Sequence, residues 1–590
     1  MSELNGNRRR RFCLVLIKPS HYDDDGYVIQ WYRSGMPSNC LAALYGLARE
    51  CAERKVLGDD VEIEIHALDE TNTRIRPEKI ASLINDADAG MAMLVGVQSN
   101  QFPRSLDIAK SLREKNIPVA IGGFHVSGTI SMLKEIDPQV KKAQEMGITL
   151  FAGEAEGRLE LVLKDAFFKN LQPLYNFMHD LPNIESVATP VLPAGRVKRT
   201  VGTTTSFDAG RGCPFTCSFC TIINVQGRKS RRRSPDDIER IIRENVKQGL
   251  YSFFITDDNF ARNKDWEIIL DRLIKLREDE KLNIRFTIQV DTLCHKLPNF
   301  IEKCQRAGVK RVFIGLENIN PDSLLGAKKR QNKITDYRTM LLAWKRIGVL
   351  TCCGYILGFP TDTKESILHD VEVIKKELPI DLLEFFYLTP LPGSEDHKKL
   401  YEAGVEMDTD LNKYDLHHIT TAHPKMSFEE WTDACRAAWE NYYSREHAET
   451  ILRRAVASGV DSAKILFYLV WFWGGVFIED IHPLEGGIFR MKYRRDRRSG
   501  LPLENPFVFY PKFYAELLWK QARWISLFTR MWLLCRKVKN DPRRLEYMDL
   551  ALEPVTDDET ETRELFQSEA AHNYVEKVKQ IELIRSGKAI

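Results

Sequence analysis

The first part of the chain alternates between short apolar runs and longer helical stretches. Runs that predict strands occur at residues 12–17, 61–68, 91–97, 117–121 and 150–152, and helical segments near 39–54 and 106–115 separate them. A run that is apolar throughout, such as 12–17, is typical of a parallel strand covered on both faces. The pattern predicts an α/β fold with a doubly wound, five-stranded parallel sheet over residues 1–175.

A second alternation of strands and helices begins after a proline-spaced linker at residues 176–202. Six strand-like runs recur at 203–209, 252–256, 285–290, 311–316, 350–357 and 383–388. Strands that alternate with helices predict a parallel barrel, and six units leave such a barrel partly open. We therefore expect a six-unit partial barrel over residues 203–400.

The remaining residues, 401–590, read as a mainly helical region. Residues 465–478 carry no charge, but this run is shorter than the ~20 residues needed to span a bilayer. Residues 510–534 are rich in aromatic side chains with interleaved Lys and Arg. Such helices either pack against the barrel or lie on a membrane surface.

Composition narrows the class of protein. The 590 residues suit about two to four domains, and 85 basic against 83 acidic residues give no whole-molecule signal for nucleic acid. Twelve cysteines without a secretory signal favour a reducing compartment over a disulfide framework. We expect a cytoplasmic protein.

Three of the cysteines stand close together. Cys213, Cys217 and Cys220 follow a C-x3-C-x2-C spacing and can close around one metal centre. A structural zinc site uses four ligands, and a four-iron cluster held by four cysteines is saturated. A cluster held by three leaves one iron open. Unrelated buried thiols, or a zinc knuckle with a distant fourth ligand, are the alternatives; the chain has no second C-x2-C pair.

The triplet, with Phe219 just before its last cysteine, resembles the motif of the radical S-adenosylmethionine (SAM) superfamily. The resemblance implies that the three thiolates hold a four-iron, four-sulfur (4Fe-4S) cluster. The open iron would bind the amino and carboxylate groups of SAM, and an electron from the cluster would cleave SAM to a 5′-deoxyadenosyl radical. A six-unit partial barrel is also the core of that superfamily.

Parallel barrels place their chemistry at the carboxyl ends of the strands. After the second strand stand Asp257, Asp258 and Asn259, which the resemblance implies receive the amino group of SAM; an Asx turn that caps the next helix is the alternative. Gln289 follows the third strand. Glu317 follows the fourth and matches a carboxylate near the ribose or methionine end, unless it only pairs with an arginine.

The fifth strand of the barrel ends in Gly354-Tyr-Ile-Leu-Gly-Phe-Pro360. This stretch resembles the G-x-I-x-G-x-P segment that flanks the adenine in the same superfamily. Gly354, Ile356 and Gly358 are therefore candidate nucleotide contacts, because glycine permits a close backbone approach.

The loops at the carboxyl edge of the first sheet resemble those of the cobalamin-binding domain that precedes the barrel in one large subfamily. The candidate contacts are Ser99, Gly122, Gly123, His125, Gly153 and Glu154. The D-x-H-x-x-G motif for cobalt ligation is absent, since His21 and Gly26 stand at a different spacing, so ligation stays open. A plain turn at the two glycines, a hydrogen-bonded loop histidine at residue 125, and a domain that only shapes the active site are the alternatives.

The tract 228–235 is strongly basic and could bind an anionic substrate or nucleic acid. Ser234 and Pro235 form a good helix start, however, so we favour a structural role beside the cluster. No nucleic-acid partner is expected.

The expected protein is a radical SAM enzyme that uses a 4Fe-4S cluster, SAM and cobalamin to functionalise, by C-methylation, an unactivated carbon. A small-molecule or lipid-like substrate, an external electron donor and a peripheral membrane contact through the C-terminal region are the expected partners. A cobalamin-independent cyclase or rearrangement enzyme, and a non-catalytic iron–sulfur protein for electron transfer or sensing, are the alternatives.

Overall fold

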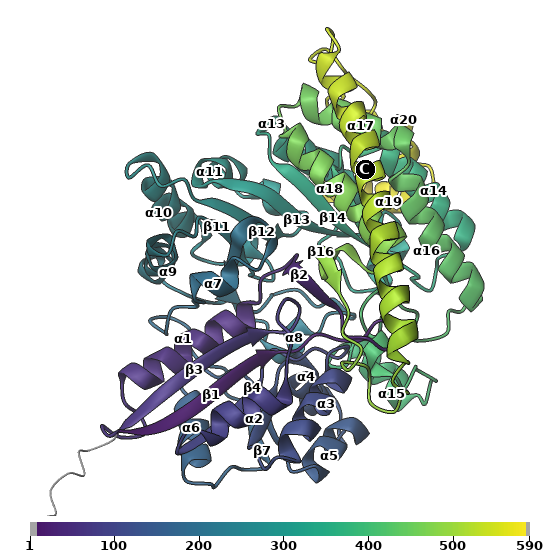
Figure 1. Cartoon of the computed structure of the whole chain (residues 1–590). Helices are drawn as coiled ribbons and strands as arrows, with labels where there is room; N and C mark the ends of the chain where they lie inside the picture. The colour runs from purple at the N-terminus through teal and green to yellow at the C-terminus, as the bar shows by residue number, and fades with distance from the viewer. Residues whose placement is uncertain (1–8, 586–590) are drawn as a thin grey trace, which may run out of the picture.

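A computed structural model of the chain describes residues 9–585 and shows three parts that pack together (Figure 1). The first contains a parallel six-stranded sheet in the order β3-β1-β4-β5-β6-β7. Its strands are β1 (Arg10–Lys18), β3 (Val61–Asp69), β4 (Ala89–Leu94), β5 (Val119–Gly122), β6 (Thr149–Ala152) and β7 (Leu174–Asn176). The five predicted strands are all present. The sixth, β7, has three residues, too few to show a pattern in the sequence.

Helices cover both faces of this sheet. α1 (Asn39–Glu53) and α6 (Leu159–Phe167) pack on one face. α2 (Pro77–Asn85), α3 (Phe102–Arg113), α4 (Phe124–Met132) and α5 (Pro138–Glu145) pack on the other. Residues 12–17 of β1 send alternate side chains into the two cores, and for this reason the run is apolar throughout.

The second part is the partial barrel. Its six parallel strands follow the order β15-β14-β13-β12-β11-β8, so the sheet stays open between the two end strands, as predicted. They are β8 (Thr204–Phe207), β11 (Ser252–Ile255), β12 (Arg285–Val290), β13 (Val309–Glu317), β14 (Leu350–Leu357) and β15 (Leu382–Tyr387). Between β7 and β8 the only α-helix is the short α7 (Ala194–Val197).

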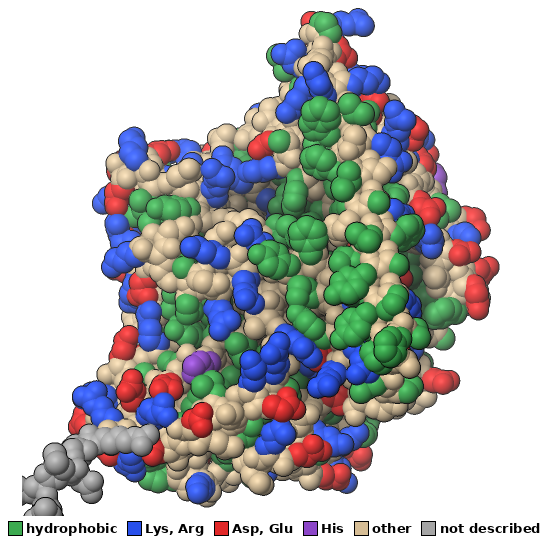
Figure 2. Space-filling model, in the orientation of Figure 1, with side chains coloured by type: hydrophobic (Ala, Val, Ile, Leu, Met, Phe, Trp, Pro, Cys, Tyr) green, Lys and Arg blue, Asp and Glu red, His purple; other side chains and the backbone are tan. Residues whose placement is uncertain are grey.

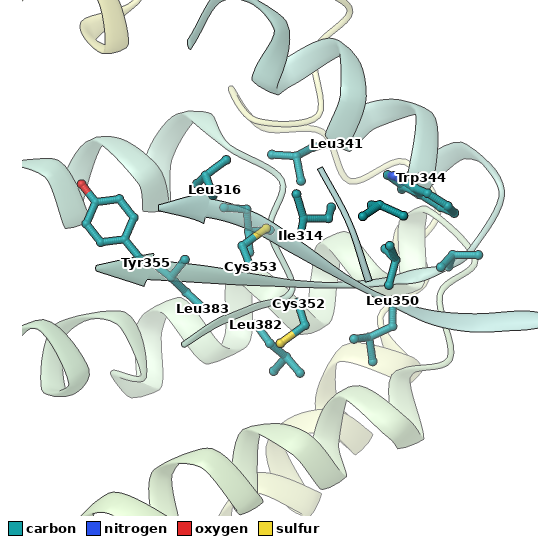
Figure 3. Packing of buried hydrophobic residues seen from close by; sticks show 14 of the residues in the cluster. Ile314, Leu316, Leu341, Trp344, Leu350, Cys352, Cys353, Tyr355, Leu382 and Leu383 are labelled. Atoms are coloured by element: carbon teal, nitrogen blue, oxygen red, sulfur yellow. The ribbon is translucent and has the colours of Figure 1, made fainter. Parts of the chain in front are cut away.

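Helices line the outer side of these strands. They are α9 (Pro235–Lys247), α10 (Trp266–Glu278), α11 (Phe300–Ala307), α13 (Tyr337–Arg346) and α14 (Lys364–Glu377), and α12 (Pro321–Gly326) follows β13. Figure 3 shows Leu341 and Trp344 of α13 packed against Ile314 of β13 and Cys353 of β14. Trp344 is fully buried there, so the α13 contact anchors the middle of the barrel.

The third part is helical, as predicted, apart from one strand. Its main helices are α15 (Glu395–Glu402), α16 (Phe428–Tyr442), α17 (Arg445–Ala457), α18 (Ser462–Gly474), α19 (Pro506–Asn540), α20 (Glu559–Thr562) and α21 (Glu569–Arg585). The strand β16 (Gly487–Met491) pairs antiparallel with β2 (Gln30–Ser34) of the first part, an unpredicted link. Within residues 9–585 one helical segment, Ser462–Glu479, is apolar and long enough to cross a membrane, and half of it is buried against the rest of the chain.

The first sheet and the barrel meet through loops that follow their strands. Gly128 of α4 touches Gly393, which lies after β15, so closely that a Cβ at either position would come within 2.8 Å of the other's Cα. The loop between β9 (Gly210–Arg211) and α8 (Ile222–Val225) lies beside this contact, because Asn224 donates to the Gly393 carbonyl at 2.9 Å. Loops at the carboxyl ends of the strands of both parallel sheets are therefore in direct contact.

Candidate active site

The three cysteines of the C-x3-C-x2-C motif lie on the loop that precedes α8. Hydrogen bonds pin this loop: the Cys213 amide donates to the Gly227 carbonyl at 3.2 Å, and the Ser218 amide donates to Ala327 at 3.1 Å. The side-chain amide of Gln331 donates to the Cys217 Sγ at 3.4 Å. The barrel thus holds the loop from the α12 side and supplies a polar hydrogen to one sulfur.

The chemistry of these thiols suits metal ligands. Burial raises the pKa of Cys213 to about 11 and that of Cys220 to about 12, so a cation must replace their protons before they carry charge. Among the residues described, the donor sets that converge within 4.8 Å are Cys13–Glu64–His66 and His21–Asp415–Glu485. The loop sulfurs do not share the ~3.8 Å spacing of ligands on one zinc ion. At least one pair of the three sulfurs therefore lies more than 4.8 Å apart, which is too wide for a single zinc ion.

The Phe219 ring lies next to an ion pair between Lys329 and Glu317. The Lys329 Nζ lies 5.7 Å from the centre of the Phe219 ring and 2.5 Å from the Glu317 Oε1. Burial alone would lower the pKa of Lys329, but Glu317 and Cys217 raise it above the ordinary value. The alternative to a nucleotide contact was that Glu317 pairs with an arginine; in the structure it pairs with a lysine, Lys329. Glu317 is the last residue of β13 and has a positive φ of 65°.

The first of the two aspartates after β11 braces the backbone. The Asp257 Oδ1 accepts from the Ala209 amide at 2.6 Å, and its Oδ2 accepts from the Asn263 side chain at 3.1 Å. Burial raises the pKa of Asp257 to about 7. Gln289 donates to the Asp257 carbonyl at 3.4 Å and belongs to the same brace. Each oxygen of Asp257 thus already accepts one hydrogen bond from the protein.

The next two residues leave acceptors open. The Oδ2 of Asp258 and the Oδ1 of Asn259 are buried and, within the described part of the chain, have no hydrogen-bond partner. The Nδ2 of Asn259 donates to Asp291 at 2.8 Å, and this bond orients the open oxygen. Burial raises the pKa of Asp258 to about 7. Two buried, unpaired oxygens beside the cysteine loop fit an ammonium donor.

Gly354 and Ile356 lie on β14, and Gly358 directly follows it; the two glycines and the isoleucine have different surroundings. A Cβ at Gly354 would come within 2.8 Å of the Phe313 ring, and one at Gly358, whose φ is +100°, within 2.0 Å of the Trp431 ring. Both glycines are therefore needed to pack the protein's own side chains. Ile356 instead clusters with Phe359 and Phe219, so only its side chain lies with the cysteine loop.

A cavity of about 160 Å³ lies at the carboxyl edge of the first sheet. Gly122, Gly123, Gly153 and Glu154 line it together with apolar residues of α1 and Arg211 of the barrel. A Cβ at Gly123, whose φ is +149°, would come within 2.1 Å of a backbone nitrogen. Gly123 borders the cavity, and the backbone of Val97 also leaves no room for a side chain at this position.

Ser99 and His125 lie outside that cavity's lining. Residue 125 was expected on a loop, but α4 begins at Phe124 and includes it. The buried His125 ring lies 4.3 Å from that of Phe102, and its Nδ1 is 3.2 Å from the Ser99 Oγ. Burial lowers the pKa of His125 to about 3. His21 points to another region, with its Nε2 3.4 Å from Glu485.

Glu154 is also part of a buried charge network that joins the two sheets. The guanidinium of Arg211 lies 2.6 Å from Glu154, 2.6 Å from Glu156 and 3.0 Å from Asp208. Arg231 of the basic tract pairs with Glu154 as well. Both oxygens of Glu154 therefore accept from arginine, and the tract contributes to structure as favoured from the sequence. Ser234 caps α9 in a capping box, as predicted.

Sequence reasoning missed Gln331, Lys329 and Arg211. Gln331 and Lys329 follow α12, in a stretch without periodicity or motif, and only the fold brings them to the cysteine loop. Arg211 precedes the motif by two positions and could have been noticed as a charge beside the cluster. The pairing of Arg211 with three carboxylates could not be predicted from the sequence.

Comparison with known proteins relates the chain to radical SAM enzymes. The family model described as "Radical SAM superfamily" matches residues 209–374. Bacteriochlorophyllide d C-8(2)-methyltransferase of Chlorobaculum tepidum is 27% identical over 55% of this chain and 72% of its own length. Hopanoid C-2 methylase of Rhodopseudomonas palustris is 23% identical over 55% of this chain and 61% of its own.

Among solved structures, the radical SAM methyltransferase TsrM from Kitasatospora setae aligns with 66% of this chain and 76% of its own, at 17% identity and a TM-score of 0.48. The family match spans the cysteine loop and the strands from β11 to β14, the segments that the geometry brings together. The chain therefore contains a radical SAM domain at residues 209–374 and is a radical SAM enzyme.

Proposed function

We propose that this protein is a cobalamin-dependent radical SAM methylase that acts on an unactivated carbon of an apolar substrate. The observation that carries the proposal is the contact between the cavity of the first sheet and the segment that carries the cysteines. Arg211, two residues before the first cysteine, lines that cavity and pairs there with Glu154. A ligand on the first sheet would thus lie next to a nucleotide at the barrel.

The residues around the loop each have a defined task. Cys213, Cys217 and Cys220 would hold the cluster, and Gln331 orients Cys217 through its 3.4 Å hydrogen bond. The open oxygens of Asp258 and Asn259 would accept from the amino group of SAM. When bound, the cluster and SAM supply a 5′-deoxyadenosyl radical that abstracts hydrogen.

The first-sheet cavity supports the corrinoid part of the proposal. Its walls include the apolar side chains of Leu44, Met93, Phe151 and Val162, and Ala120 lies on β5 between them. An apolar slot between a sheet and a helix suits a flat aromatic group such as the nucleotide base of cobalamin. Cobalamin would supply the methyl group. His125 does not line the cavity, so we propose that it does not ligate cobalt, although its Nε2 is buried without a partner among the described residues.

The names of the relatives support methyl transfer to an apolar framework. Bacteriochlorophyllide and hopanoid, the compounds named for two of them, are large ring systems. We propose a substrate of that class for this enzyme. Because the protein must receive electrons to reduce the cluster, a separate electron donor is part of the proposal.

Corrinoid content tests the proposal. The wild-type protein, purified without oxygen from cells supplied with cobalamin, should carry a corrinoid detectable by visible absorbance and mass. Ala120→Phe should fill the slot and remove the corrinoid while iron and sulfide content stay unchanged. A wild-type protein that retains its cluster and binds no corrinoid would overturn the methylase proposal in favour of a cobalamin-independent radical enzyme.

A further inference from the structure

The outer face of α19 is unusually apolar for an exposed helix. Of its 35 residues only Phe509, Leu527, Leu534, Cys535 and Val538 are buried. Ten large apolar side chains are exposed instead: Phe507, Val508, Tyr510, Tyr514, Leu518, Trp519, Ile525, Phe528, Trp532 and Leu533. Figure 2 shows hydrophobic side chains gathered in a band along this helix. Exposed patches of this kind mark interaction sites.

The exposed residues form a stripe. At ~3.6 residues per turn, Phe507, Tyr514, Leu518, Ile525 and Trp532 fall on one face of the helix. Phe507 is 88% exposed, Leu518 71% and Ile525 67%. The stripe runs for about 37 Å at a rise of ~1.5 Å per residue. This length exceeds what one bound peptide side chain or small ligand would cover.

Basic residues flank the exposed apolar face on one side. By the same helical spacing, Lys512, Arg523, Arg530 and Lys537 form a row about 120–160° around the helix from the centre of the stripe, at the edge of the apolar face that Trp519 marks. α19 carries seven basic residues and one acidic residue, Glu516, which pairs with Lys520 at 2.8 Å. The Arg523 guanidinium stacks 4.7 Å from the Trp519 ring, an arrangement of charge over an aromatic side chain. The surface thus combines apolar, aromatic and cationic groups.

We propose that this face, the α19 stripe with its basic flank, docks the protein on an anionic lipid surface. An apolar stripe flanked by Lys and Arg is the arrangement of helices that lie in the membrane interface. Trp and Tyr prefer the same depth, with one polar atom toward water. The long basic side chains reach lipid phosphates while their stems cover apolar surface.

A second copy of this chain fits the face less well. A symmetric pair places the same patch of each subunit against the other. A pair of α19 helices packed along the stripe would offer the basic row no acidic partner on the facing helix, because the one acidic residue of α19, Glu516, is already paired with Lys520. Charge complementarity therefore favours an anionic partner surface. The inference does not depend on the substrate or on cobalamin.

Vesicle sedimentation tests the docking. The full-length, cluster-loaded protein should bind vesicles of phosphatidylcholine with phosphatidylglycerol at low salt, and more weakly at high salt, where charges are screened. The triple variant Phe507→Ser, Leu518→Ser, Ile525→Ser should bind at least about tenfold more weakly, because three exposed side chains no longer enter the interface. Lys512→Glu with Arg530→Glu should reduce binding to anionic vesicles by a similar factor.

A matched control separates this face from general surface effects. Ile136→Ser, Leu161→Ser, Phe168→Ser removes three exposed apolar side chains from the first part of the chain and should bind like the wild type. All variants should melt at the wild-type temperature, since the substituted residues are exposed. Absence of wild-type binding at low salt, or equal binding by the α19 variant, would overturn the proposal. So would a wild-type dimer that ignores vesicles and that the α19 variant converts to a monomer.

Discussion

Arg211 is the residue on which the junction of the two sheets most depends. It is buried, and its three carboxylate partners are buried too. Arg211→Ala would leave the buried Glu156 without a cation and remove one of the two cations at Glu154 and at Asp208, which costs about 3–5 kcal/mol of unfolding free energy. Arg211→Lys should recover only part of the loss, because a lysine cannot form the planar fork that reaches several carboxylates. Denaturant unfolding measures both; an Arg211→Ala protein as stable as the wild type would contradict the network.

His418 gives the molecule a predictable dependence on pH. Its Nδ1 lies 2.9 Å from Asp415 and its Nε2 lies 3.2 Å from Asp24. Burial alone would lower the pKa of His418, but hydrogen bonds to the two aspartates raise it to about 10 from an ordinary 6.5. The folded state therefore holds the proton over a range in which the unfolded state has lost it.

His418→Gln should accordingly destabilise the protein most below pH 6.5, where the histidine is charged in both states. The stabilisation by the charged histidine is lost as the pH rises from about 6.5 through about 10, so the gap to the variant should narrow over that range. Unfolding free energies of both proteins at several pH values check this. A gap that widens with rising pH would contradict the assignment of charge.

The residue scale also shows where sequence reasoning stopped. The cysteines, Asp258 and Asn259 could be named in advance, because a local motif or a strand end marks each. Gln331 and Arg211 could not be given roles, since their partners are set by the fold. Glu154 was expected to face a cofactor, yet two arginines from the barrel occupy its oxygens, a contact that no local pattern records.

At the scale of elements, the contact of β14 with α16 ties the barrel to the helical region. Gly358, the residue directly after β14, lies against the Trp431 ring of α16. Gly358→Ala should lower the unfolding free energy by about 3 kcal/mol, because the added methyl overlaps the ring and the positive φ is strained. Thermal and denaturant unfolding provide the measurement.

Gly326→Ala is the matched control for this substitution. Gly326 ends α12, and a Cβ there would meet nothing within 4 Å. The variant should be as stable as the wild type or slightly more stable, since alanine favours the helix. Equal effects of the two substitutions would contradict the contact between Gly358 and Trp431.

Elements with a local pattern were predicted well, and elements that depend on distant partners were not. The barrel strands recur as short strand-like runs between helical stretches, so all six were found from the sequence. β2 and β16 pair across more than 450 residues, and neither has a run that stands out by itself. The extra strand β7 gains its place only by lying beside β6.

On the scale of the whole molecule, the barrel and the helical region share one core. The buried cluster that begins at Phe207 in β8 continues without a break to Val575 in α21. Arg338 of α13 is buried and donates to Glu559 at 2.7 Å, which fixes the segment before α21 to the barrel. The barrel should therefore not fold without the region after residue 400.

Amide hydrogen exchange tests this unity. The central strands β13 and β14 and the helices α16 and α17 should open with similar free energies, because elements that share one core belong to one cooperative unit. A chain that ends at residue 400 should be insoluble or lack cooperative unfolding. Exchange of α16 and α17 at a much lower free energy than the strands would contradict a shared core.

The central claim is that three cysteines at the barrel's carboxyl edge hold a cluster with an open iron that cleaves SAM. Formation of 5′-deoxyadenosine by the anaerobically reconstituted, reduced protein tests it most directly. The account predicts 5′-deoxyadenosine from the wild type and from Cys51→Ala, which alters a buried cysteine of α1, and none from Cys217→Ala. A fully loaded wild-type protein that leaves SAM intact, or a Cys217→Ala protein that still cleaves it, would contradict the account.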